Sequence, residues 1–265
     1  MPKIAECLGT LALIAGAFLA ATSAQAQSQG FSHQDWNSVV SKYVDARGRV
    51  NYQGLSQDRS ALDRYVAAVE KTSPRSNPEL FPTRNDSLAY YLNAYNAMVF
   101  KGVLARWPDV ESVWYPFGTG LGFFVNMDIK VGGQVTNLKR LEDDIVRGEF
   151  KDPRVHAALN CASLGCPILP QKAFEPATLD ADLDAGMRGF VAETRNCAVD
   201  PGAKSVRLSK IFDWFAADFL GFERRMGNTN PKILDYLNRY RAANAQIPRE
   251  YSVGYFDYDK SLNKQ

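Results

Sequence analysis

The sequence is poor in the side chains that most often carry chemistry. Its 265 residues include only 2 histidines, His33 and His156, and 4 cysteines. It has no glycine-rich phosphate loop, no nucleophile elbow and no paired metal-binding motif. These absences exclude the common signatures of nucleotide-binding proteins, serine hydrolases and zinc modules. They direct attention to the one segment in which histidine and cysteine lie close together.

Neither sign of charge dominates the chain. The 31 Lys and Arg residues nearly balance the 29 Asp and Glu residues, and the net charge is +2. Both signs are mixed along the sequence, so we predict no nucleic-acid surface. No linker rich in proline, glycine or serine, no low-complexity tract and no repeat divides the chain. We therefore predict a single domain over residues 27–265.

Only the N-terminus carries an uninterrupted apolar run. Lys3 precedes the apolar residues 8–21, and the small-residue triplet Ala24-Gln25-Ala26 follows. This order is typical of a cleaved signal peptide, which we predict at residues 1–26 with Cys7 inside it. The run is shorter than the roughly 20 residues that span a membrane, and no later segment supplies one. We expect a periplasmic or secreted protein without a membrane span.

Apolar periodicity predicts a mixture of helices and strands. We expect a hairpin at 122–135 that turns at Gly132-Gly133, a buried strand at 154–160 and a late strand at 253–258. Since strands and helices do not alternate regularly, the fold class is α+β, with a central helix packed on an antiparallel sheet. That helix is apolar almost all round and therefore buried. The predicted helices cover 35–44, 60–71, 88–106, 179–194, 210–220 and 232–243, and a short one carries Leu138, Leu141 and Ile145.

The strongest candidate for chemistry is the segment 156–167. Cys161 and Cys166 follow His156 within ten residues. An imidazole beside a thiol is the usual means of making a thiolate at neutral pH. We therefore name His156 as base and Cys161 as nucleophile, with a free thiol of lowered pKa as the expected property.

Two other interpretations of the same cysteines stay open. In an oxidising compartment Cys161 and Cys166 could form a disulfide that staples the loop, or either could pair with Cys197. As a metal site, the two thiols and His156 would supply three ligands without the paired spacing of structural zinc sites. We predict no metal and no cofactor.

Polar residues on the predicted helices are the remaining candidates. Asn93 and Asn96 lie three apart, so they share one face of the central helix. Their amides could hold the backbone of a neighbouring loop, orient His156, or donate to a developing oxyanion. Glu142 is the candidate to orient His156, and Arg147 could hold a ligand carboxylate. The predicted ligand-binding residues are Asn93, Asn96, Asn160, Cys166 and Arg147.

Five stretches together resemble the domain-of-unknown-function 547 family. They are residues 91–97 (YLNAYNA), 141–147 (LEDDIVR), 156–167 (HAALNCASLGCP), 208–215 (LSKIFDWF) and 256–259 (FDYD). The resemblance spans about residues 31–263 and implies a fold similar to papain-like and transglutaminase-like thiol enzymes. In those enzymes a cysteine opens the central helix and a histidine follows on a strand. Here the helix has no cysteine and offers Asn93 and Asn96 instead.

Two functions follow from these observations. The first is a thiol-dependent enzyme, a hydrolase or transferase, acting on an amide, a peptide or a small thiol compound such as glutathione. The second is a binding module that recognises a peptide or small thiol compound in the same pocket without turnover, with the cysteine loop fixed by a disulfide.

Overall fold

The structure, a computed structural model, describes residues 30–115 and 118–265. The predicted signal peptide and Cys7 lie outside the described residues. Within them, helices are mixed with two small sheets, which confirms the α+β class. No helix in the described part is long and apolar enough to cross a membrane. The prediction of a single domain over 27–265 stays a prediction.

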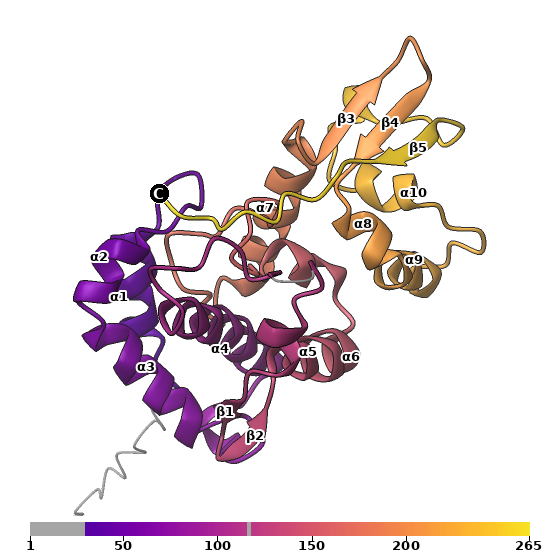
Figure 1. Cartoon of the computed structure of the whole chain (residues 1–265). Helices are drawn as coiled ribbons and strands as arrows, with labels where there is room; N and C mark the ends of the chain where they lie inside the picture. The colour runs from indigo at the N-terminus through magenta and orange to yellow at the C-terminus, as the bar shows by residue number, and fades with distance from the viewer. Residues whose placement is uncertain (1–29, 116–117) are drawn as a thin grey trace, which may run out of the picture.

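Two groups of buried apolar side chains lie along the chain. The first surrounds the central helix and draws mainly on residues before 184, and the second is built from residues 187–247 together with Ala157. Figure 1 shows the second group's elements, β3–β5 and α8–α10, beside the helices of the first. The helices and turns of the first group are α1 (Gln34–Tyr43), α2 (Tyr52–Gln57), α3 (Ser60–Lys71), η1 (Pro78–Leu80), α4 (Arg84–Leu104), η2 (Leu121–Val125), α5 (Leu138–Arg140), η3 (Leu141–Arg147), α6 (Gly148–Phe150) and η4 (Pro153–Ala157), with strands β1 (Ile129–Val131) and β2 (Gln134–Thr136).

The second half begins with α7 (Leu179–Ala192), which packs against η4. A three-stranded sheet follows in the order β3-β4-β5, in which β3 and β4 are antiparallel and β4 and β5 are parallel. The sheet is therefore mixed and not purely antiparallel. Its strands are β3 (Cys197–Asp200), β4 (Ser205–Leu208) and β5 (Ser252–Tyr255), with α8 (Ile211–Trp214), α9 (Ala216–Arg225), α10 (Ile233–Asn238) and η5 (Ala243–Ala245) between β4 and β5.

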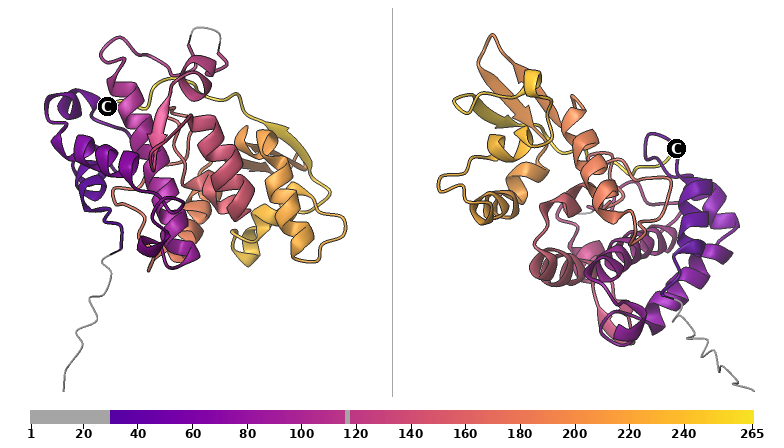
Figure 2. Two further views of the ribbon diagram at one scale, coloured as in Figure 1. Left: turned by 90° about the horizontal axis from the view of Figure 1, so that it is seen from below. Right: turned by 180° about the vertical axis from the view of Figure 1, so that it is seen from behind.

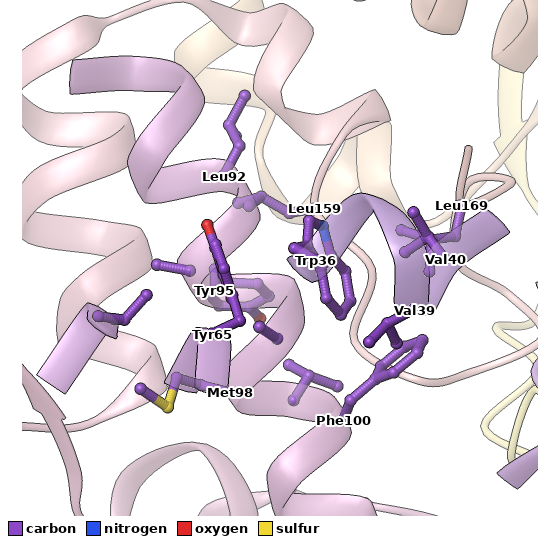
Figure 3. Close-up of a cluster of buried hydrophobic side chains, with 14 of the residues drawn as sticks. Trp36, Val39, Val40, Tyr65, Leu92, Tyr95, Met98, Phe100, Leu159 and Leu169 are labelled. Carbon is purple, nitrogen blue, oxygen red and sulfur yellow. The ribbon is translucent and has the colours of Figure 1, made fainter. Parts of the chain in front are cut away.

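The central helix α4 begins with a capping box. The Thr83 side chain accepts from the Asp86 backbone N–H, and Asp86 Oδ2 accepts from the Thr83 backbone N–H at 2.9 Å. Beyond this start nearly every side chain is buried, as predicted. Figure 3 shows Tyr95, Met98 and Phe100 of this helix among side chains of α1 and α3. The main neighbours of α4 are α3, η3 and α5, so helices, and not the expected antiparallel sheet, cover most of it.

The predicted strand at 154–160 is wrong, because residues 153–157 form a 3₁₀ turn. Pro153 stands at its first position, and the Asp152 side chain accepts from the Arg154 N–H, which starts a helical turn. The residues are buried between α7, α9 and η3, so their apolar character reflects burial and not strand pairing. His156 therefore stands on a tight helical turn.

Other boundaries differ from the sequence predictions. The hairpin at Gly132-Gly133 is confirmed, but its expected first half contains the helical turn η2. Gly132 has a φ of +55°, and a Cβ there would lie 2.1 Å from Ser73 Oγ, so only glycine fits. The helix predicted at 210–220 is split into α8 and α9, and α10 is shorter than 232–243. The strands β3 and β4 were not predicted.

Candidate functional site

The loop 161–167 is covered by the last residues of the chain. Leu164 N–H donates to the Ser261 carbonyl and Gly165 N–H donates to the Asp259 carbonyl, both at 2.9 Å. A Cβ on Gly165 would lie 2.8 Å from the Tyr258 ring, so glycine permits this close approach. Figure 2 shows the tail returning from the C-terminal half to the first helices in both views. The tail thus places Tyr258 against the loop.

Asn96 and Asn160 hold the loop from beneath. Asn96 Nδ2 donates to the Ala158 carbonyl at 3.0 Å, and its Oδ1 accepts from the Asn160 N–H at 2.9 Å. Asn160 Nδ2 in turn donates to the Pro167 carbonyl at 2.9 Å. Both side chains are buried. They position the loop and do not line the cavity that contains His156 and Cys161, although Asn160 lines a second cavity beside the loop.

Asn93 also holds a segment of backbone, but at a different place. Its Nδ2 donates to the Phe174 carbonyl at 2.8 Å, and its Oδ1 accepts from the Phe174 N–H at 3.0 Å. It therefore fixes the chain after the loop 161–167, which we call the thiol loop. Asn93 is fully buried and does not line the cavity described below, so the structure does not place it where the expected oxyanion donor would stand.

Cys161 and Cys166 are both free thiols and lie together. The Cys161 backbone N–H donates to Cys166 Sγ at 3.0 Å. The Tyr258 hydroxyl lies 3.2 Å from Cys161 Sγ and 3.1 Å from Cys166 Sγ. The structure therefore holds neither the Cys161–Cys166 disulfide nor a disulfide to Cys197, which is also free.

The two thiols differ in acidity. A hydrogen bond from Cys166, opposed by burial and assisted by Tyr258, lowers the pKa of the Cys161 thiol. Burial, together with the neighbouring Cys161, raises the pKa of the Cys166 thiol. Burial also raises the pKa of Cys197. Because the thiolate is the reactive form of cysteine, Cys161 is the candidate nucleophile among the three.

His156 is oriented by Asp218, a residue that the sequence reasoning missed. His156 Nε2 lies 2.8 Å from Asp218 Oδ2, and the ring stacks on Phe215 with centroids 4.1 Å apart. Arg147 Nε donates to the same Asp218 oxygen at 2.7 Å, and its guanidinium also binds Asp143. Arg147 is thus occupied by protein carboxylates and not open to the ligand carboxylate that we expected it to hold.

The protonation of this pair follows from its surroundings. Burial lowers the pKa of the His156 imidazole, although the Asp218 carboxylate opposes the shift. Partial burial acts against ionisation of Asp218, but hydrogen bonds from His156 and Arg147 lower its pKa to about 2. At neutral pH the imidazole is therefore neutral and donates its Nε2–H to the carboxylate. This leaves Nδ1 as the basic nitrogen.

Glu142 occupies a different position from the one predicted. Tyr95 donates its hydroxyl proton to Glu142 Oε2 at 3.0 Å. Burial raises the pKa of the Glu142 carboxyl to about 7, although the Tyr95 hydrogen bond opposes the shift. Glu142 therefore does not orient His156; it is a carboxyl group that exchanges a proton near neutral pH.

These groups meet at one cavity of about 110 Å³. Its polar lining includes His156, Cys161, Cys166, Glu142 and Tyr258. The cavity lies between the two buried groups of the fold, where ligand sites are common. Its walls are mainly aromatic, from Tyr95, Trp114, Phe124, Trp214 and Phe215.

The side chains of this cavity that could bind a metal have protein partners. Within residues 30–115 and 118–265, no group of three or more His, Cys, Asp or Glu side chains is arranged to hold an ion. His156 instead bonds to Asp218, and the two thiols bond to Tyr258.

Replacing Asp218 by asparagine should lower the free energy of unfolding by an amount that depends on pH. The pKa of Asp218 is lower in the folded chain than in the unfolded one, so its stabilisation is complete above about pH 4 and fades as the pH falls towards 2. We expect Asp218→Asn to cost on the order of 1–2 kcal/mol at pH 7, after allowance for solvent screening. Urea unfolding between pH 3 and pH 7 measures the difference.

Asp213→Asn is the matched control for that experiment. Asp213 forms a surface ion pair with Lys210 at 2.7 Å. Its loss should cost no more than about 0.5 kcal/mol. An Asp218→Asn deficit that stays constant from pH 7 to pH 3 would contradict the assigned ionisation.

Residues 80–191 match the model of a family described as "Protein of unknown function, DUF547". The matched stretch contains α4, Glu142, His156 and both loop cysteines, whereas Asp218 and Tyr258 lie outside it. The resemblance to this family is thus confirmed for that stretch. Comparison with curated proteins and comparison with solved structures find no match.

Proposed function

We propose that the cavity is the site of a thiol-dependent acyl transfer or hydrolysis in which Cys161 is the nucleophile. The observation that carries the proposal is that Cys161, His156 and Glu142 line the same cavity while Asp218 orients the histidine. Three properties support it: the lowered pKa of Cys161, the neutral imidazole and a carboxyl group that titrates near pH 7.

The proposed reaction begins with proton transfer from the Cys161 thiol to the Glu142 carboxylate. The thiolate attacks the carbonyl carbon of an amide, peptide or thioester and forms a thioester with Sγ. Glu142 returns the proton to the leaving amine or thiol. Water then attacks the thioester, His156 Nδ1 accepts its proton, and that proton passes to the departing Cys161 sulfur. The Tyr258 hydroxyl is the nearest candidate to donate to the oxyanion.

The size of the cavity limits the acyl group. About 110 Å³ is well below the roughly 300–1,000 Å³ of sites that enclose a whole drug-sized ligand. The aromatic walls favour an apolar or flat group of a few non-hydrogen atoms. We therefore propose that the reacting end of the substrate enters the cavity and that the rest stays outside. We place this activity in the periplasm or outside the cell, on the strength of the N-terminal signal pattern.

The first test is a comparison of the three thiols. Iodoacetamide at pH 6 should modify Cys161 at least about tenfold faster than Cys197, because only Cys161 has a lowered pKa. Peptide mapping of the native protein over a range of pH gives the three rates. A Cys161 rate equal to that of Cys197 would be evidence against an activated thiol.

A small activated ester tests the chemistry itself. We expect p-nitrophenyl acetate to release nitrophenolate in a burst of one equivalent and to leave an acetyl group on Cys161. Cys161→Ala should lose the burst, whereas Cys197→Ala, which changes a buried thiol outside the cavity, should keep it. A burst that survives in Cys161→Ala would end the proposal.

The second candidate function is a binding module without turnover. It is favoured by one observation: in the described residues no hydrogen bond joins Cys161 to His156, and the Cys161 thiol bonds to Tyr258 and Ser163 instead. A module of this kind should bind a small aromatic or peptide ligand equally well after Cys161 is replaced by serine. Loss of the ester burst without loss of binding would distinguish the two functions.

A further inference from the structure

A second cavity lies on the other side of the thiol loop. It measures about 410 Å³, and Cys166 and Pro167 line both this cavity and the smaller one. Arg47 and Arg49 line it from the chain between α1 and α2, and Arg195 lines it from the chain after α7. We name this second cavity the arginine cleft. It is large enough for a small molecule.

The turn that carries Arg47 and Arg49 is held in a fixed shape. Asp45 Oδ1 accepts from the backbone N–H groups of Arg47 and Arg49 at 2.8 and 2.9 Å. Gly48 has a φ of +73°, and a Cβ at this position would lie 2.7 Å from the Leu169 nitrogen. Only glycine fits there, so the turn is pressed against the chain that follows the thiol loop. The two arginines therefore stand on a rigid support beside Cys166.

The arginine cleft has an excess of positive charge. Three arginines are among its lining residues, and Asp259 is the only acidic residue among them. Arg195 already binds Glu193 and donates to the Leu164 carbonyl at 2.7 Å, which ties the thiol loop in place. Arg47 and Arg49, by contrast, are exposed and form no ion pair with any described residue. Free guanidinium groups bind carboxylates and phosphates through paired hydrogen bonds.

We propose that the arginine cleft binds an anionic group, a carboxylate or a phosphate, on the molecule whose other end reaches the thiol pair. Arg47 and Arg49 supply the charge, and Cys166 with Pro167 is the wall shared with the reactive cavity. This inference rests on the proposed function, because it names the class of its substrate. It adds a requirement for negative charge that the small aromatic cavity alone does not impose.

Two alkylating reagents that differ in charge test the inference. The ratio of the iodoacetate rate to the iodoacetamide rate is measured at Cys161 and Cys166 separately, by peptide mapping at low ionic strength. We expect the double variant Arg47→Ala/Arg49→Ala to lower this ratio roughly fivefold at the thiol that reacts. The variant removes two positive charges that attract the iodoacetate anion. About 0.5 M salt should lower the wild-type ratio towards that of the variant.

The matched control is Arg140→Ala/Arg224→Ala. These two arginines are also exposed and also lack ion pairs in the described residues, but they line none of the cavities around the thiol loop. The control changes the net charge equally, so its ratio should stay near the wild-type value. An equal fall in both double variants, or a fall in neither, would overturn the anion site. The iodoacetamide rate alone reports on the activated thiol, so the two proposals can fail separately.

If neither thiol is alkylated in the native protein, the proposed activated thiol fails and inorganic phosphate becomes the probe. Sodium phosphate should then raise the Tm of the wild type above its value in sodium chloride of equal ionic strength. The arginine control variant should show the same rise, and Arg47→Ala/Arg49→Ala a smaller one, because phosphate also stabilises folded proteins without binding to a site. An equal rise in Arg47→Ala/Arg49→Ala and the wild type, or no rise in the wild type, would overturn the anion site.

Discussion

Replacing Glu142 by glutamine should stabilise the protein at pH 8 and leave it nearly unchanged at pH 5. Burial raises the pKa of Glu142 to about 7 in the folded chain, whereas the ordinary value is 4.5. The folded state therefore holds the extra proton between these pH values, and stability falls as the pH rises from about 4.5 through 7. Glutamine removes this loss and still accepts the Tyr95 hydrogen bond.

The expected gain is about 2 kcal/mol at pH 8, because part of the side chain is open to the cavity and the shift is screened there. Urea unfolding at pH 5 and pH 8 measures it. Glu250→Gln is the control, since Glu250 is exposed and should change stability by less than about 0.5 kcal/mol at either pH. If the difference in stability between Glu142→Gln and the wild type is the same at pH 5 and pH 8, the pKa of Glu142 is not raised by folding.

Glu142→Gln also separates stability from function. The variant should be more stable at pH 8 but should release nitrophenolate more slowly, because glutamine cannot carry the proton of the proposed reaction. A gain in stability at the expense of activity is the behaviour expected of a catalytic carboxyl group held in an unfavourable environment. A variant with full activity would assign Glu142 to the wall of the cavity alone.

Asn96→Ala and Asn93→Ala should destabilise the protein by similar amounts but differ in their effect on the thiols. Each substitution leaves a buried backbone N–H and a buried carbonyl without a partner, at Asn160 and Ala158 or at Phe174. The cost should be about 3 kcal/mol in each case. Because domains of this size are usually stable by roughly 5–15 kcal/mol, both variants should fold.

The thiols distinguish the two positions. Asn96 holds the chain that leads directly into Cys161, whereas Asn93 holds Phe174, which does not line the cavity. Asn96→Ala should therefore loosen the thiol loop and raise the alkylation rate of Cys166 several-fold, while Asn93→Ala should not. Urea unfolding gives the stabilities and peptide mapping gives the rates. Equal thiol reactivity in the two variants would mean that Asn96 does not position the loop.

The sequence predicted local structure well where a single apolar periodicity or a turn motif identified the element. The helix α3 begins and ends at the predicted residues, and the buried helix α4 and the turn at Gly132-Gly133 were also anticipated. The 3₁₀ turn at His156 was mistaken for a strand, because a short apolar run that is buried on all sides has the same composition in either form. The strands β3 and β4 have only four residues each, too few for a clear alternation.

The candidate site was predicted only in part, for a comparable reason. His156, Cys161 and Cys166 are neighbours in sequence, so their proximity could be inferred, and Glu142 was placed in the right cavity with the wrong partner. Asp218 follows His156 by 62 residues and Tyr258 follows Cys166 by 92, and both depend on how distant segments pack. For Asp218 no local signal was available. Tyr258 lies within the motif at 256–259, which could have indicated its place.

The C-terminal tail has a consequence for the order in which the site is made. Asn263, which donates to Asn160 Oδ1 at 3.2 Å, is synthesised 103 residues after its partner. A nascent chain therefore presents Cys161 and Cys166 to its surroundings before Tyr258 exists to cover them. Until the last residues are made, the contacts of Leu164 with Ser261 and of Gly165 with Asp259 cannot form. The cover over Cys161 and Cys166 is thus the last part of the site to be completed during synthesis.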